Sequence, residues 1–238
     1  MIKVKVFSDC HGYLPNITEE FDLLLIAGDI TPCAWGYGSK IVQLDWIYNE
    51  FKEWLDNLPY RTSMSKVYLV PGNHDRAFDG ITENERKTLK ETLGNKFELL
   101  LHEEKTFTNI SEEGNFKEIR IFGTPFCKKF GNWSFMYDDE ILTDLYNEIP
   151  EGLDILITHD PPTLNNLGMI SEGRQKGVNA GNSILAERVL KIKPKYLFSG
   201  HIHSGNHSFE EYEGILMANV AHVNEQYYPV FKVLSFEL

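Results

Sequence analysis

The stretch KVYLVPGNHD at residues 66–75 decides the fold class of this chain. Val67–Val70 is a short apolar run with β-branched and aromatic residues, which is typical of a buried strand. Pro71 and Gly72 end this strand, because proline has no ladder donor and glycine accepts unusual backbone angles. An amide, an imidazole and a carboxylate therefore follow at the carboxyl end of a strand, where open α/β sheets bind their ligands.

The same arrangement recurs at four other predicted strands. These strands are Ile2–Phe7, Phe21–Ala27, Asp154–Thr158 and Tyr196–Ser199. The possible metal ligands that follow the five strands are Asp9 and His11, Asp29, Asn73 and His74, His159, and His201 and His203. A single histidine at a strand end is usually an ordinary core or surface residue, but chance does not explain five such strand ends. His102, His207 and His222 lack this setting, and we assign them no function.

The segments between these strands complete an α/β pattern. Helical spacing of apolar residues predicts helices at 41–58, 82–93, 141–149 and 183–192. Thr82 and Glu85 have the spacing of a capping box at the start of the second helix. Short strands divided by turns predict a meander over Phe97–Phe126, and Ile215–Asn219 and Val230–Phe236 are the two closing strands. We expect one domain over residues 1–238.

Composition restricts the setting and the partners. The 238 residues are 42% hydrophobic, without an apolar run long enough for a membrane span and without a signal-peptide pattern. Three widely spaced cysteines, Cys10, Cys33 and Cys127, indicate reduced thiols and a cytoplasmic protein. The net charge of −12 repels nucleic acid, so we expect neither a nucleic-acid polymer nor a membrane as partner.

The ligand set itself indicates the chemistry. Oxygen and imidazole donors without thiolates suit manganese, iron, zinc or nickel. Even without His74, seven ligands are too many for one tetrahedral ion and suit two ions that share a carboxylate. Two ions ~3.5–4 Å apart can hold the attacking and leaving oxygens of an in-line displacement and lower the pKa of a bridging water. The positive charge of two divalent ions exceeds the negative charge of Asp9, Asp29 and a bridging hydroxide. The site therefore has a net positive charge, which favours binding of a phosphate.

These residues form blocks that resemble, in order, the five motifs of the calcineurin-like metallophosphoesterases. The blocks are Asp9-x-His11, Gly28-Asp29, Gly72-Asn73-His74-Asp75, His159 and Gly200-His201-Ile202-His203. The resemblance covers nearly the whole chain. Further residues are similar to the metallophosphodiesterase-domain branch, namely Phe122–Phe126, Asn132-Trp133-x-Phe135, Asp154–Pro162 and Asn219. Two positions depart from that branch, since Asp160 replaces its usual glycine and Cys10 its usual threonine.

The resemblance implies a four-layer α/β-β/α sandwich with two mixed sheets and two metal ions at one rim. One ion would be bound by Asp9, His11, Asp29 and His203. The other would be bound by Asp29, Asn73, His159 and His201, so that Asp29 bridges the two. We expect manganese foremost, with iron, zinc or nickel as alternatives. A hydroxide that bridges the ions would attack phosphorus, and His74, oriented by Asp75, would protonate the leaving oxygen.

Three other functions are compatible with parts of this pattern. Protein phosphatases that cleave monoesters have arginines beside these motifs, but the positions here are occupied by Thr31, Pro32 and Pro71. Charge from elsewhere would have to come from Arg76, Arg174 or Lys176, which read as surface residues. A nuclease is disfavoured by the acidic balance. A non-catalytic interaction module would typically have lost ligands. We therefore expect a hydrolase of small phosphodiesters, with cyclic nucleotides as leading candidates.

Overall fold

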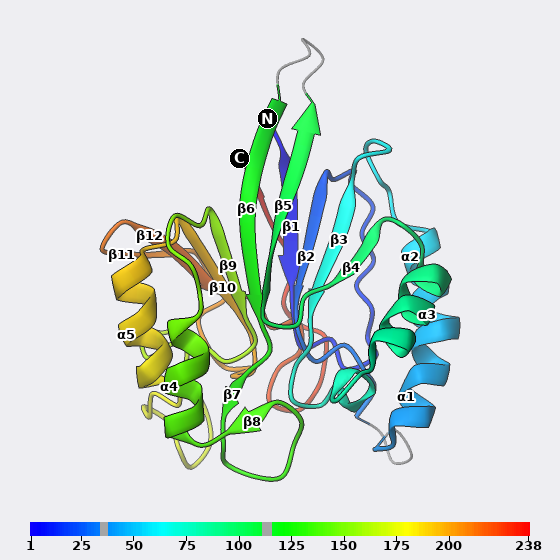
Figure 1. The fold of residues 1–238 in the computed structure, drawn as a ribbon. Coiled ribbons are helices and arrows are strands. Elements are labelled where there is room, and N and C mark those ends of the chain that lie inside the picture. Colours follow the sequence, from blue (N-terminus) through cyan, green and yellow to red (C-terminus); the bar gives the residue numbers. More distant parts are fainter. Residues whose placement is uncertain (34–37, 111–115) are drawn as a thin grey trace.

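The computed structural model describes residues 1–33, 38–110 and 116–238, and two mixed sheets form its centre (Figure 1). The first sheet has the order β13-β1-β2-β3-β4. Its strands are β1 (Lys3–Phe7), β2 (Leu23–Ala27), β3 (Lys66–Val70), β4 (Phe97–Leu99) and β13 (Leu234–Glu237). The strands β1 to β4 are parallel, and β13 pairs antiparallel with β1. All carboxyl ends of the four parallel strands therefore meet at one edge.

The second sheet has the order β11-β12-β10-β9-β6-β5. Its strands are β5 (Glu103–Ile110), β6 (Phe116–Thr124), β9 (Ile155–Thr158), β10 (Tyr196–Ser199), β11 (Glu210–Tyr212) and β12 (Ile215–Asn219). The four inner strands are parallel, and β5 and β11 pair antiparallel at the two edges. A separate short pair consists of β7 (Cys127–Lys128) and β8 (Met136–Tyr137).

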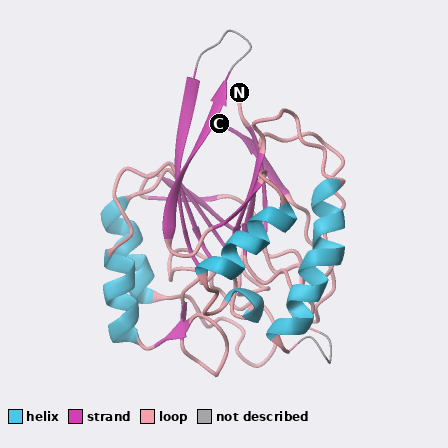
Figure 2. Ribbon diagram, turned by 45° about the vertical axis from the view of Figure 1, so that its right-hand side comes forward, coloured by secondary structure: helices cyan, strands magenta, loops and turns pink. Residues whose placement is uncertain are grey.

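Helices cover the outer face of each sheet (Figures 1 and 2). Those on the first sheet are α1 (Lys40–Trp46), the π-helical turn η1 (Ile47–Phe51), α2 (Lys52–Asp56) and α3 (Glu83–Leu93). The helices on the second sheet are α4 (Asp139–Asn147) and α5 (Ser183–Ile192). This arrangement confirms the expected four-layer α/β-β/α sandwich. No helix in the described part of the chain combines the length and apolarity that a membrane span requires.

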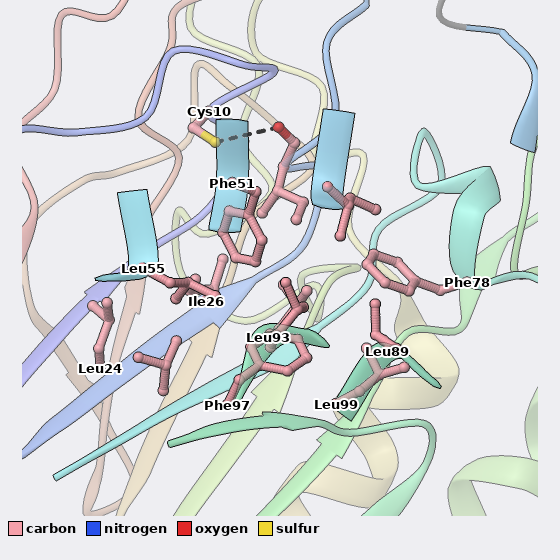
Figure 3. Packing of buried hydrophobic residues seen from close by; sticks show 14 of the residues in the cluster. Cys10, Leu24, Ile26, Phe51, Leu55, Phe78, Leu89, Leu93, Phe97 and Leu99 are labelled. Carbon is pink, nitrogen blue, oxygen red and sulfur yellow. Dashed lines mark hydrogen bonds between the residues drawn. The ribbon is translucent and has the colours of Figure 1, made fainter. Parts of the chain in front are cut away.

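Apolar side chains fill the three spaces between the four layers. In β2, Leu24 and Ile26 pack under the helices of the first sheet, together with Phe51 and Phe97 (Figure 3). Leu25 on the same strand points the other way and packs between the two sheets. This strand is apolar at every position because both of its faces are covered.

The structure corrects two predicted strands. The expected meander over residues 97–126 does not include β4, which follows α3 and adds to the first sheet parallel to β3, pairing Phe97 with Val67. A strand–helix–strand connection normally gives such parallel pairing. Only β5 and β6 form an antiparallel hairpin there. The last strand is shorter than expected, since Val230 and Phe231 donate their N–H groups to the carbonyl of His222 instead of to a sheet.

Candidate metal centre

Every ligand proposed from the sequence lies at the rim where the two sheets meet. The loops after β1, β2 and β3 of the first sheet carry Asp9, His11, Asp29, Asn73 and His74. The loops after β9 and β10 of the second sheet carry His159, His201 and His203. Because these strands are parallel within their sheets, their carboxyl ends bring together residues that are up to 194 positions apart, Asp9 and His203.

The backbone at this rim is strained. Asp9, His11, Asp29 and His201 have positive φ values of 47°, 43°, 53° and 65°. Residues with a side chain seldom adopt this conformation, and where they do the site is often functional. Gly72 makes room for a ligand residue, because a Cβ atom on it would lie 2.1 Å from Oδ1 of Asp29. The local backbone is therefore shaped to bring ligand atoms together.

The first ligand group consists of Asp9, His11 and His203. The ligand atoms of these three residues all lie within 4.8 Å of one another. The Nε2 atoms of His11 and His203 are 3.2 Å apart, and Nε2 of His203 is 3.4 Å from Oδ1 of Asp9. A carboxylate oxygen and two imidazole nitrogens so close together fit one divalent cation.

The second ligand group consists of Asp29, His159 and His201, whose ligand atoms also lie within 4.8 Å of one another. Oδ1 of Asn73 joins this group at 2.9 Å from Nε2 of His159. Oδ2 of Asp29 lies 3.4 Å from Nε2 of His159 and 3.8 Å from Nε2 of His11. This one oxygen therefore faces both groups, as a shared carboxylate would.

Neighbouring groups orient the ligand side chains. Nδ1 of His159 lies 2.8 Å from the carbonyl of Ala27, and Nδ1 of His203 lies 3.1 Å from the carbonyl of Asn224. Donation to these carbonyls leaves Nε2 of each ring facing the centre, an arrangement common around protein-bound metals. The backbone N–H of His201 donates to the Asp9 carboxylate at 3.0 Å, which links a ligand loop of one sheet to a ligand of the other.

The electrostatics of the centre also fit cations. Burial opposes ionisation of Asp9, yet its hydrogen bond with His203 and the charge of His159 lower the pKa of its carboxyl to about 2. Burial lowers the pKa of His11 to about 4 and that of His201 to about 3, so both imidazoles are neutral near pH 7. Despite burial, the charge of Asp29 raises the pKa of His159 to about 10. Ionised carboxylates and neutral imidazoles are the forms that bind metals, so Asp9, His11 and His201 have the required form near pH 7, whereas His159 would release a proton when it binds an ion.

The two residues expected to handle protons lie beside the second ligand group. The His74 backbone N–H donates to Oδ1 of Asp29 at 2.8 Å. The Asp75 carboxylate accepts from the N–H groups of Gly72 and Thr31, both at 2.9 Å. Asp75 therefore ties the loop after β2 to the loop after β3, and this contact positions His74 through the backbone.

Sequence reasoning overlooked Cys33. Its sulfur lies 2.7 Å from Nδ1 of His11 and 3.2 Å from Nδ1 of His74. The thiol therefore contacts both a candidate metal ligand and the candidate proton donor. Its position four residues after Asp29, in a loop leaving the rim, was the only signal in the sequence, and spacing alone does not distinguish it from an ordinary free thiol.

The two departures from the branch pattern have structural partners away from the ligand atoms. Asp160 is buried, and its Oδ2 accepts from the N–H of Lys128 at 2.9 Å and from Nδ2 of Asn182 at 3.0 Å. Cys10 is also buried and directs its sulfur to the carbonyl of Ile30 at 3.5 Å (Figure 3). Asp160 therefore holds neighbouring segments together, and Cys10 is part of the packed core under the first sheet.

Two mixed sheets with histidine and aspartate groups at their common rim define a class of metal-dependent phosphoesterases. The sequence matches the calcineurin-like phosphoesterase family over residues 2–205, and the chain belongs to this family. Membership supports a phosphoric ester hydrolase that uses divalent metals.

Individual relatives agree with this assignment. Human metallophosphoesterase domain-containing protein 1 is 30% identical over 83% of this chain and 59% of its own length. The Caenorhabditis elegans UPF0046 protein T07D4.2 is 30% identical over 77% of this chain and 46% of its own length. The chain thus spans about half the length of these curated relatives. The phosphopantetheinyl hydrolase PptH of Mycobacterium tuberculosis shares the fold, with a TM-score of 0.57 at 13% identity, over 94% of this chain and 90% of that one.

Proposed function

We propose that this chain is a two-metal phosphodiesterase that hydrolyses small phosphodiesters, with cyclic nucleotides as the leading candidates. The observation that carries this proposal is Oδ2 of Asp29, which faces both ligand groups at 3.4 Å and 3.8 Å. A carboxylate shared by two ions would hold them close enough together to act on one phosphate. The acidic surface, with a net charge of −12, favours a small substrate over a long polyanion.

Different residues would bind the two ions and donate the proton. Asp9, His11, Asp29 and His203 would bind one ion, and the second would be bound by Asp29, Asn73, His159 and His201, with manganese foremost. When bound, divalent ions supply positive charge for the phosphate and activate water as the nucleophile. His74 would donate a proton to the leaving oxygen from Nε2, since its Nδ1 lies against the sulfur of Cys33.

Charge matching favours diesters over monoesters. A diester carries one negative charge, whereas a monoester carries nearly two at neutral pH and spreads charge over three oxygens in the transition state. Enzymes that prefer such groups commonly use arginines, which match the oxygen geometry and remain charged. The corresponding positions here include Thr31, which is buried and bonded to Asp75, and Pro71. Of the other cations, Arg174 and Lys176 are exposed, and Arg76 is exposed as well and donates to the carbonyl of Asn132 at 3.4 Å.

The test is a comparison of kcat/KM on bis(p-nitrophenyl) phosphate and p-nitrophenyl phosphate with protein reconstituted in Mn²⁺, Fe²⁺, Zn²⁺ or Ni²⁺. The two substrates share their leaving group and differ in the second ester. We expect the diester to be preferred, and 3′,5′-cyclic nucleotides to be hydrolysed under the same conditions. A tenfold preference for the monoester would contradict the diesterase proposal. Absence of turnover in protein that carries two ions would instead favour a non-catalytic interaction module.

A further inference from the structure

Two exposed aromatic rings lie directly against histidines of the centre. The Trp133 ring centroid is 4.3 Å from that of His74, and the Phe130 ring centroid is 5.4 Å from that of His201. These side chains are nevertheless 42% and 65% exposed. Exposed aromatic rings that gather beside a polar site are candidates for ligand contact.

The segment that carries these rings, residues 129–135 between β7 and β8, is held firmly to the centre. We call it the aromatic loop. The N–H of Ser134 donates to the carbonyl of Asn73 at 3.1 Å. A Cβ atom on Gly131 would lie 3.1 Å from the Trp133 ring, so this ring rests against the glycine. Arg76 contacts the loop from outside, with its guanidinium carbon 6.0 Å from the Trp133 ring centroid. The Trp133 ring, fixed in this way, loses little freedom when a ligand binds.

A third ring lies on the side of the first ligand group. The Tyr227 ring centroid is 4.8 Å from that of His11 and 5.1 Å from that of His203. The aromatic loop thus flanks His74 and the second ligand group, while Tyr227 flanks the first group. Aromatic side chains therefore lie beside histidines of both ligand groups.

We propose that Trp133 and Phe130 form a stacking platform for a planar aromatic group, such as a nucleobase, on the alcohol part of the substrate. This inference rests on the proposed phosphodiesterase function. His74 would protonate the leaving oxygen, so the group attached to that oxygen is brought next to Trp133. Stacking on aromatic side chains is tolerant of base identity, since every base has a π face. The platform therefore selects a class of substrate and does not select one base.

The experiment measures equilibrium binding and does not require turnover. Metal-loaded protein is titrated with adenosine 5′-monophosphate and with ribose 5-phosphate, which carry the same phosphate and differ by the base. We expect the nucleotide to bind about 5- to 150-fold more tightly, the range that corresponds to ~1–3 kcal/mol per stacked base. Trp133→Ala should remove most of this ratio, and Trp133→Phe should retain part of it because a ring remains.

Phe116→Ala is the matched control. Phe116 is 73% exposed and begins β6 at the end of that strand away from the rim, so its removal should leave the ratio unchanged (Figure 1). Equal binding of the two ligands by the wild type would overturn the platform, as would an equal loss for both ligands in Trp133→Ala. If the protein binds the nucleotide more tightly than the sugar phosphate but does not hydrolyse diesters, only the proposed function is wrong. If it hydrolyses diesters but binds the two ligands equally, only the stacking platform is wrong.

Discussion

The two sheets contribute different chemistry to the same centre. The first sheet supplies both carboxylates, the amide of Asn73, the imidazole of His11 and the proposed proton donor His74. The second sheet supplies imidazoles alone, from His159, His201 and His203. Each ligand group nevertheless contains residues of both sheets. Neither sheet could therefore hold an ion alone in the arrangement observed, and the packing between the sheets is part of the metal site.

The contacts across the rim show how this dependence is built. The carbonyl of Ala27, at the end of β2, accepts from His159 of the second sheet, and the N–H of His201 donates to Asp9 of the first. Buried residues such as Leu25 and Phe198 fill the space between the sheets behind these contacts. A change to the Asp29 carboxylate should therefore affect both groups, whereas a change to a second-sheet imidazole should affect one.

The largest expected effect separates these two cases directly. Asp29→Ala removes the oxygen that faces both ligand groups, so purified protein should lose both ions and its activity. His201→Ala removes a ligand of the second group alone, so one ion should remain. Elemental analysis of metal per chain distinguishes the variants. If Asp29→Ala retained one ion and its activity, the assignment of Asp29 as a carboxylate shared by two ions would be wrong.

The next effect concerns His74, the proposed proton donor of the first sheet. His74→Ala should keep the metal content and the fold but lower the rate by about 10²–10⁴-fold, the usual contribution of general acid catalysis. A diester with an aryl leaving group should suffer less than one with an alkyl leaving group, because a good leaving group needs less protonation. His222→Ala, a histidine outside both ligand groups, is the control. Equal losses on both substrates would argue that His74 only positions the substrate.

A smaller effect is expected from Cys33, whose sulfur contacts His11 and His74 of the first sheet. Cys33→Ala removes the partner of Nδ1 in His11, and loss of such a supporting contact typically costs about 10–100-fold in metal affinity or activity. Cys33→Ser retains a hydrogen-bonding atom and should lose less. Competition with a chelator measures the metal affinity. If serine and alanine behave alike, the contact between Cys33 and His11 does not support the ligand.

The sequence predicted which residues gather at the rim better than it predicted the surroundings of these residues. The ends of these strands can be predicted because Gly28 and Pro71 directly follow apolar runs and end them. The side chains that come next then lie at the rim. Contacts such as that of Cys33 with His74, or of Trp133 with the same ring, depend on how loops from separate strands fold over each other. No local sequence pattern determines how these loops lie relative to one another. The same limit explains β4, whose three residues did not reveal which sheet they would join.

The smallest effect extends the comparison to the helices that cover each sheet. Thr82 caps α3 on the first sheet in the expected capping box with Glu85, at an exposed site. Thr82→Ala should lower the free energy of unfolding by about 0.5–2 kcal/mol and leave activity unchanged. Asn182 caps α5 on the second sheet, accepting from the N–H groups of Ile184 and Leu185.

Asn182 differs from Thr82 because its other side-chain atom reaches toward the centre. Its Nδ2 donates to Asp160, which follows His159 directly and also accepts from Lys128 at the start of the segment leading to the aromatic loop. Asn182→Ala therefore removes a cap and also a buried donor, whose loss alone costs about 1–3 kcal/mol. Urea unfolding should show a larger loss of stability than in Thr82→Ala, and the activity should fall as well. If both variants lose only stability, the cap of α5 does not influence the metal centre. The centre then depends on the packing of the two sheets and not on the helices that cover them.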